Sequence, residues 1–207
     1  MRFVYLNKFK KIEISLIMAM VLTAAISISG FAASCNGIEH SVLRMHVIAN
    51  SDKDYDQELK LKVRDAVLKE GSDVFGGASD VKNAEMKIVE SQDRLLEVAK
   101  NVIKDEGYDY KVRIEIGQEY FNTRTYDTIT LPAGQYRAVR IIIGEGAGKN
   151  WWCVMFPPLC LPGATEESEI DAVLTDGESK LVKSDPKVDA RFKIVEVFEK
   201  ILDFIKD

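Results

Sequence analysis

An apolar run near the N-terminus constrains this chain most. Residues 14–33 carry no charged side chain, and they follow a basic start formed by Arg2, Lys8, Lys10 and Lys11. A basic start followed by an apolar run is typical of an export signal. These twenty residues also reach about the length that spans a bilayer. Residues 1–35 are therefore predicted to be a signal peptide or an N-terminal membrane anchor.

Small residues end the apolar run, and three kinds of processing are possible for this segment. A signal peptidase would cut after Ala32 or after Ser34. Without cleavage the segment would stay as an anchor. Lipid attachment at Cys35 is the third alternative, although alanine stands at positions 32 and 33, where bacterial lipoproteins usually carry a bulky aliphatic residue.

The chain beyond residue 35 is acidic. The full sequence holds 28 Lys and Arg against 33 Asp and Glu; residues 1–35 contain four of the basic and one of the acidic residues, which leaves 24 against 32 and a net charge of −8. Because nucleic-acid binding needs a basic face, no nucleic-acid partner is expected. A protein or a neutral ligand is favoured. The roughly 170 remaining residues are enough for one domain with a core.

Periodicity predicts a single α+β domain over residues 36–162. Alternating apolar residues indicate strands at 43–47, 110–116 and 139–143. A further segment, 123–131, is rich in Thr, Tyr and Ile and is expected to pair with strand 110–116. Apolar stripes at three- and four-residue steps indicate helices at 54–70 and 83–104. The expected architecture is an antiparallel or mixed sheet with these two long helices on one face.

The C-terminal part of the chain changes character. Residues 163–186 are rich in Asp and Glu with few large apolar residues, which is typical of a flexible acidic linker. Residues 187–207 carry an apolar stripe that indicates an amphipathic helix. This C-terminal helix would either pack on the domain or dock on a partner.

The segment between Leu131 and Cys160 holds both tryptophans, a glycine-rich loop and two of the three cysteines. It is predicted to form a surface hairpin, with Gly144–Asn150 as the mobile or tightly turned loop. In an oxidising compartment Cys153 and Cys160 would pair and staple it. Two buried free thiols remain the alternative, because Pro157 and Pro158 lie between them.

Catalytic, metal and nucleotide motifs are not found. The acids at 52, 54 and 56 lack the glycine and glutamate of a calcium loop, and the glycine loop has neither phosphate-binding nor dinucleotide spacing. Of the two histidines, only His46 with Asp52 is kept as an alternative acid–base pair. No enzyme activity, cofactor or metal is therefore expected.

Two blocks carry a resemblance to a known family. The first is residues 43–52 with 60–67, and the second runs from Leu131–Gly134 to Trp151–Cys160. Together they are similar to the stage II sporulation protein R family of endospore-forming bacteria, over about residues 42–161.

This resemblance implies a signalling protein that the forespore secretes into the space between the forespore and mother-cell membranes. There it would activate the sporulation sigma-E factor processing peptidase, a membrane-embedded aspartic protease that removes the pro-sequence of pro-sigma-E. The chain itself would contact a membrane only through an uncleaved N-terminal segment.

The family brings no assigned contact residues, so the candidate site comes from the residues themselves. Trp151 and Trp152 are proposed as the aromatic anchor of a protein interface, together with Lys149, Asn150 and Phe156. Burial of both tryptophans beneath the loop is the alternative. The competing function is an exported cell-wall-binding module or hydrolase, in which His46, Asp52 and the tryptophans would face a glycan or a peptide.

Overall fold

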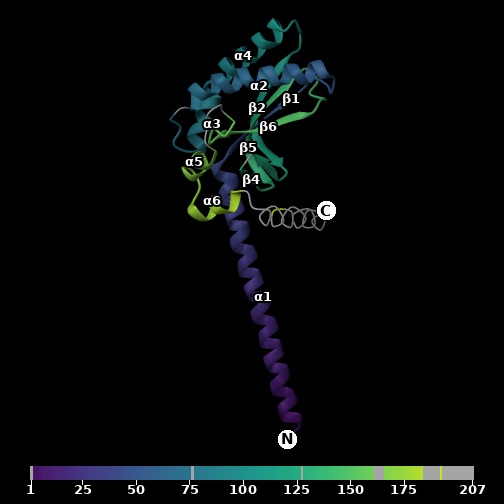
Figure 1. Cartoon of the computed structure of the whole chain (residues 1–207), viewed down its shortest axis with the longest axis vertical. Helices are drawn as coiled ribbons and strands as arrows, with labels where there is room; N and C mark the ends of the chain where they lie inside the picture. Colours follow the sequence, from purple (N-terminus) through teal and green to yellow (C-terminus); the bar gives the residue numbers. More distant parts are fainter. Residues whose placement is uncertain (1, 76, 127, 161–165, 184–191, 193–207) are drawn as a thin grey trace.

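The computed structural model describes residues 2–75, 77–126, 128–160, 166–183 and 192 (Figure 1). Its helices are α1 (Arg2–Ser41), α2 (Asp54–Phe75), α3 (Val81–Glu90), α4 (Gln92–Asp105), α5 (Glu166–Asp171) and α6 (Asp176–Val182). Its strands are β1 (Leu43–Ile48), β2 (Val112–Phe121), β3 (Arg124–Tyr126), β4 (Ile129–Leu131), β5 (Gly134–Ile143) and β6 (Asn150–Phe156).

Four strands form one mixed sheet in the order β2-β5-β1-β6. Strand β1 is parallel to β5 and antiparallel to β6, and β2 is antiparallel to β5. The α+β class with a mixed sheet is therefore confirmed. The predicted hairpin is wrong, because β1 lies between β5 and β6. Almost every side chain of β1 is buried, so this strand needs a neighbour on each side.

Helices α2, α3 and α4 cover one face of the sheet, as predicted (Figure 1). Their apolar stripes pack on alternate residues of β1, and the shared core includes Leu43, Met45, Val47, Leu59, Val63, Ile88, Leu95 and Ile103. The helix expected at 83–104 is two helices separated at Ser91, whose backbone is not helical. Asp80 caps α3 by accepting a hydrogen bond from the Asn83 N–H at 2.8 Å.

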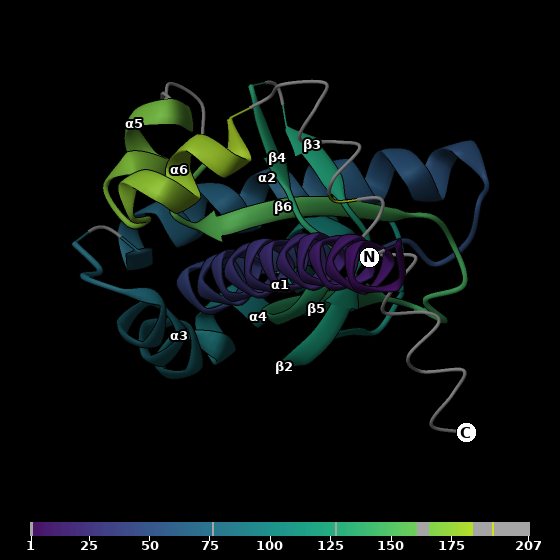
Figure 2. The same cartoon turned by 90° about the horizontal axis from the view of Figure 1, so that it is seen from below.

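The opposite face is covered by the end of α1, the β3–β4 pair, and helices α5 and α6 (Figure 2). Strands β3 and β4 form their own two-stranded sheet, so the predicted pairing of segment 123–131 with β2 is wrong. Strand β2 pairs with β5 instead, over its whole length.

The flexible linker predicted at 163–186 is wrong for residues 166–183. This stretch forms α5 and α6, and it buries Ile170, Leu174 and Val182 against the sheet. Thr175 and Glu178 form a capping box at the start of α6. The C-terminal helix predicted at 187–207 lies outside the described residues, apart from Phe192, which is buried beside Cys35.

Helix α1 holds the apolar run and continues without a break into the domain (Figure 1). Residues Lys10–Ser41 are long and apolar enough to cross a membrane. Within this helix the hydroxyls of Ser15, Thr23 and Ser34 donate to backbone carbonyls one turn earlier. From Cys35 onward the helix is part of the domain, because Cys35 and Ile38 are buried. The apolar run thus ends two residues before the core begins.

Cys153 and Cys160 form a disulfide with seven residues of sequence separation. Closing this short loop is expected to stabilise the protein by about 2.5 kcal/mol on the chain-entropy model. Reduction should therefore lower the urea midpoint of the wild-type chain and leave that of a Cys160→Ser variant unchanged. Equal effects of reductant on both proteins would contradict a stabilising bridge.

Candidate partner-binding site

Strand β6 sends its two tryptophans to opposite faces of the sheet, as successive strand residues must. Trp151 lies on the side of α2 and is 40% exposed, with the Arg64 guanidinium 4.2 Å from its ring centroid. Trp152 is half-buried on the other face, where its ring stacks on His46 at 4.7 Å. The two tryptophans therefore differ. The ring of Trp151 is partly exposed, as an interface residue would be, whereas the ring of Trp152 packs in a side-chain cluster.

The glycine loop positions the start of β6 by clamping the turn that follows β1. Asp52 accepts a hydrogen bond from the Lys149 N–H at 2.7 Å, and Asn50 Oδ1 accepts one from Glu145 N–H at 3.1 Å. Gly148 packs so closely that a Cβ there would lie 2.3 Å from the Ser51 carbonyl oxygen. Two amides of this loop also donate to backbone carbonyls of the turn. The loop is thus tightly turned, and the two sequence blocks meet in space.

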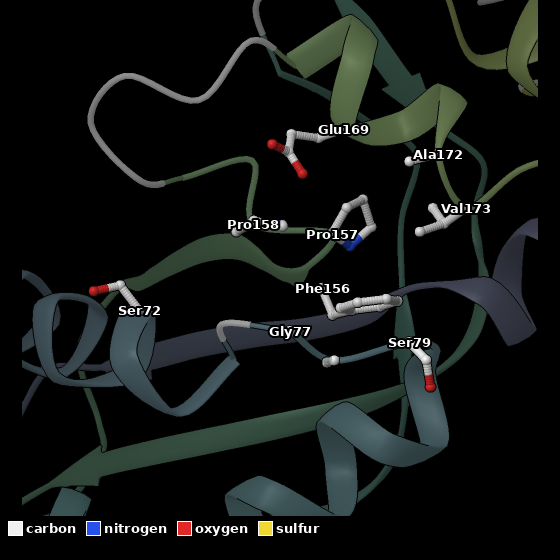
Figure 3. Close-up of a pocket in the computed structure, with 10 residues that line it drawn as sticks. Ser72, Gly77, Ser79, Phe156, Pro157, Pro158, Glu169, Ala172 and Val173 are labelled. Atoms are coloured by element: carbon white, nitrogen blue, oxygen red, sulfur yellow. The ribbon is translucent and has the colours of Figure 1, made fainter.

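The predicted residues at the strand ends have different surroundings. Lys149 is exposed and Asn150 is half-buried at the start of β6. Phe156, at the other end, is only 6% exposed and belongs to the core beneath α2 and α3. Phe156 lines a pocket of about 270 Å³ together with Pro157, Pro158, Ser72 and Glu169 (Figure 3).

His46 does not pair with Asp52. Its ring is buried on the face of the sheet that carries Trp152, and its Nε2 lies 2.9 Å from Glu119 Oε2 on β2. Asp52 is committed to the glycine loop instead. The alternative acid–base pair is therefore wrong, and Glu119 takes the place of its carboxylate. Sequence spacing could not reveal the pairing of His46 with Glu119, because the strand order of the sheet brings these two residues together.

Charged side chains surround His46. Burial lowers its pKa to about 4, and the positive charges of Arg140 and Arg44 act in the same direction. Burial also raises the pKa of Glu119, against the effect of Arg140. Arg140 donates to Glu115 at 2.6 Å, which extends this polar row across β5 and β2. At neutral pH His46 is uncharged.

The stability of the protein is expected to depend on His46 between pH 6.5 and 4.5. The unfolded chain binds a proton at His46 near pH 6.5, whereas the folded chain binds it near 4, so stability is present above 6.5 and is lost as pH falls. The free energy of unfolding should drop by about 2 kcal/mol over this range. The raised pKa of Glu119 acts in the opposite sense, so the measurement is the difference between wild type and His46→Gln, which keeps Glu119. Parallel pH profiles of the two proteins would contradict the assignment.

Arg44 lies on the same face and is enclosed by aromatic rings. Its guanidinium carbon is 4.0 Å from the Phe121 ring centroid and 4.7 Å from that of Tyr136. The Tyr126 hydroxyl accepts a hydrogen bond from Arg44 Nη2 at 2.7 Å. Arg124, on the same strand as Tyr126, stacks over Trp152 at 5.0 Å. Sequence reasoning missed this group, although Arg44 and His46 alternate along β1.

The cluster around His46 and Arg44 lacks the parts of a nucleophilic catalyst. A relay needs a hydroxyl or thiol held against the histidine. Within the described ranges neither ring nitrogen of His46 has such a hydrogen-bond partner. The same residues contain no group of three or more His, Cys, Asp or Glu placed to hold a metal ion. Aromatic rings and arginines, in contrast, are the side chains enriched at protein interfaces.

Comparison with known proteins identifies the family. The family model for stage II sporulation protein R matches residues 39–166, which includes all six strands and every candidate site residue named above. The chain belongs to the stage II sporulation protein R family. Membership of this family gives the chain a role in sporulation. No solved structure matches it.

A curated relative supports the same assignment. Stage II sporulation protein R of Bacillus subtilis (strain 168) is 37% identical over 123 residues, which is 59% of this chain and 55% of the relative. The match thus spans little more than half the length of that relative.

Proposed function

We propose that this chain is an exported sporulation signal that activates the membrane-embedded aspartic protease processing pro-sigma-E. It would act from the space between the forespore and mother-cell membranes. Membership of the stage II sporulation protein R family supports this role. We expect the signal to work by binding, since neither ring nitrogen of the buried His46 is held against a hydroxyl or thiol in the described part of the chain.

The continuity of α1 is the observation that carries the proposal. The apolar run ends at Ala33, and the first core residue is Cys35. With the segment uncleaved, the domain would sit on the surface of the membrane that holds its anchor and would face the space from which it contacts the protease. With the segment cut after Ala32 or Ser34, Ile38 and Val42 still hold the end of α1 on the sheet.

Trp151 is the proposed anchor of the contact. Its ring is 40% exposed, and Arg64 stacks on it from α2. An exposed aromatic ring beside an arginine is the composition of an interface hot spot. The protease would be activated because the signal binds its active arrangement more tightly than its inactive one.

The experiment measures pro-sigma-E processing in sporulating cells that lack this chain, with and without a restored copy. Processing that depends on the restored copy is expected. Processing that continues without the chain would contradict the proposal. A pulldown of the purified chain on peptidoglycan checks the competing wall-binding function. Retention of the chain on the peptidoglycan would support that function.

A further inference from the structure

Arg44 carries a buried positive charge to which the described residues supply no negative partner. Its side chain is fully buried. One terminal nitrogen donates to the Tyr126 hydroxyl, while Nε and the second terminal nitrogen have no hydrogen-bond partner in that part of the chain. A buried charge without a counter-charge is costly, so it destabilises the fold that contains it.

The aromatic rings around Arg44 compensate this charge only in part. Phe121 and Tyr136 present their faces to the guanidinium and attract it as cation–π partners. A ring face does not supply the planar pair of oxygen acceptors that a guanidinium fork fits. Arg44 Nε and Nη1 therefore keep N–H donors without an acceptor among the described residues. A carboxylate in place of the Tyr126 hydroxyl would accept from Nη2 and from one of these two nitrogens at the same time.

Tyr126 is the most exposed of the three aromatic rings that surround this guanidinium. Phe121 and Tyr136 are buried, whereas Tyr126 is half-buried and lies on β3, whose other residues are exposed. In the described chain β3 pairs only with β4, outside the main sheet. Beside it, Arg124 covers the ring of Trp152 on the edge strand β6. A partner side chain that displaces the Tyr126 hydroxyl would reach Arg44 from the surface where β3 lies beside the edge strand β6.

We propose that Arg44 receives the carboxylate of an aspartate or glutamate from a protein partner, in place of the Tyr126 hydroxyl. The aromatic rings would flank the acidic side chain, and Arg124 would add a second positive charge at the rim. The inference rests on the proposed function, because the partner is the protein that the signal contacts. It adds the chemistry of that contact: an acidic residue on a segment that lies along β3 and β6.

The test replaces Arg44 with methionine in the full-length chain, which removes the charge and keeps a long apolar side chain. The melting temperature of the purified protein in detergent is expected to stay the same or to rise, because a buried unpaired charge is gone. Pro-sigma-E processing in sporulating cells is expected to fall roughly thirtyfold or more, since losing one member of a buried, hydrogen-bonded charge pair has an effect of this size.

Two further variants sharpen the result. Arg44→Lys keeps the charge but loses the planar fork, so processing should fall between that of wild type and Arg44→Met. Arg137→Met, which removes an arginine paired with Glu85 on the helix-covered side, is the matched control and should process normally.

Normal processing by Arg44→Met would overturn the carboxylate site. A marked drop in its melting temperature together with lost processing would also overturn it, since Arg44 would then act as support for the fold. Failure of the proposed function gives a different result, because cells that lack the whole chain would then still process pro-sigma-E, and the carboxylate site would fall with it.

Discussion

Replacing Ile38 with alanine is expected to lower the free energy of unfolding of the full-length chain by about 3 kcal/mol. Ile38 is fully buried on the face of the sheet opposite α2, with Phe121, Leu131 and Tyr136, although it belongs to the helix that begins with the apolar N-terminal run. Removing three carbons there leaves a cavity between α1 and the sheet. The two tryptophans, both on β6, report unfolding in urea by their fluorescence.

Asn36→Ala is the matched control for this prediction. Asn36 lies half a turn earlier on the same helix and is exposed, so its side chain contributes little. Its urea midpoint should match that of wild type. A midpoint for Ile38→Ala equal to that of the control would show that the end of α1 does not belong to the core.

Replacing Trp151 with alanine is expected to reduce pro-sigma-E processing at least tenfold while leaving the protein level unchanged. Its ring is partly exposed and contacts Arg64, so the loss in stability should stay near 1 kcal/mol. An interface tryptophan, in contrast, contributes 2 kcal/mol or more, which is about thirtyfold in binding. The readouts are processing in sporulating cells and an immunoblot of the chain.

Trp152→Ala separates the two tryptophans. Trp152 packs on His46 and edge-on against Phe121 at 4.9 Å, so its removal should lower the stability and the level of the protein. The opposite pattern, with stable Trp152→Ala inactive and Trp151→Ala active, would move the anchor to the other face of β6.

Local patterns were sufficient to predict most of the main elements. Alternation in β1, β2 and β5 and the apolar stripes of α2 and α4 each place apolar side chains in the core between the sheet and the helices. The error at 163–186 came from composition, because the acidic residues outweighed the few apolar ones that are buried. The capping box at Thr175 and Glu178 was a local signal that favours a helix there.

Strand neighbours and the His46 cluster could not be predicted in the same way. Closeness in sequence favours a hairpin between β5 and β6, and only the need to bury both faces of β1 places that strand between them. Glu119 and Phe121 reach His46 and Arg44 through the register of β2 on β5 and of β5 on β1. Such contacts depend on the whole sheet, so no short motif marks them.

The most direct test of the proposed signalling role is a reconstitution in a bacterium that does not sporulate. The protease and pro-sigma-E are produced together, with or without this chain carrying its own N-terminal segment, and the conversion of pro-sigma-E is followed by immunoblot. Conversion only when the exported chain is present is the expected result. Equal conversion with and without the chain, or none when all three proteins are present and folded, would contradict direct activation.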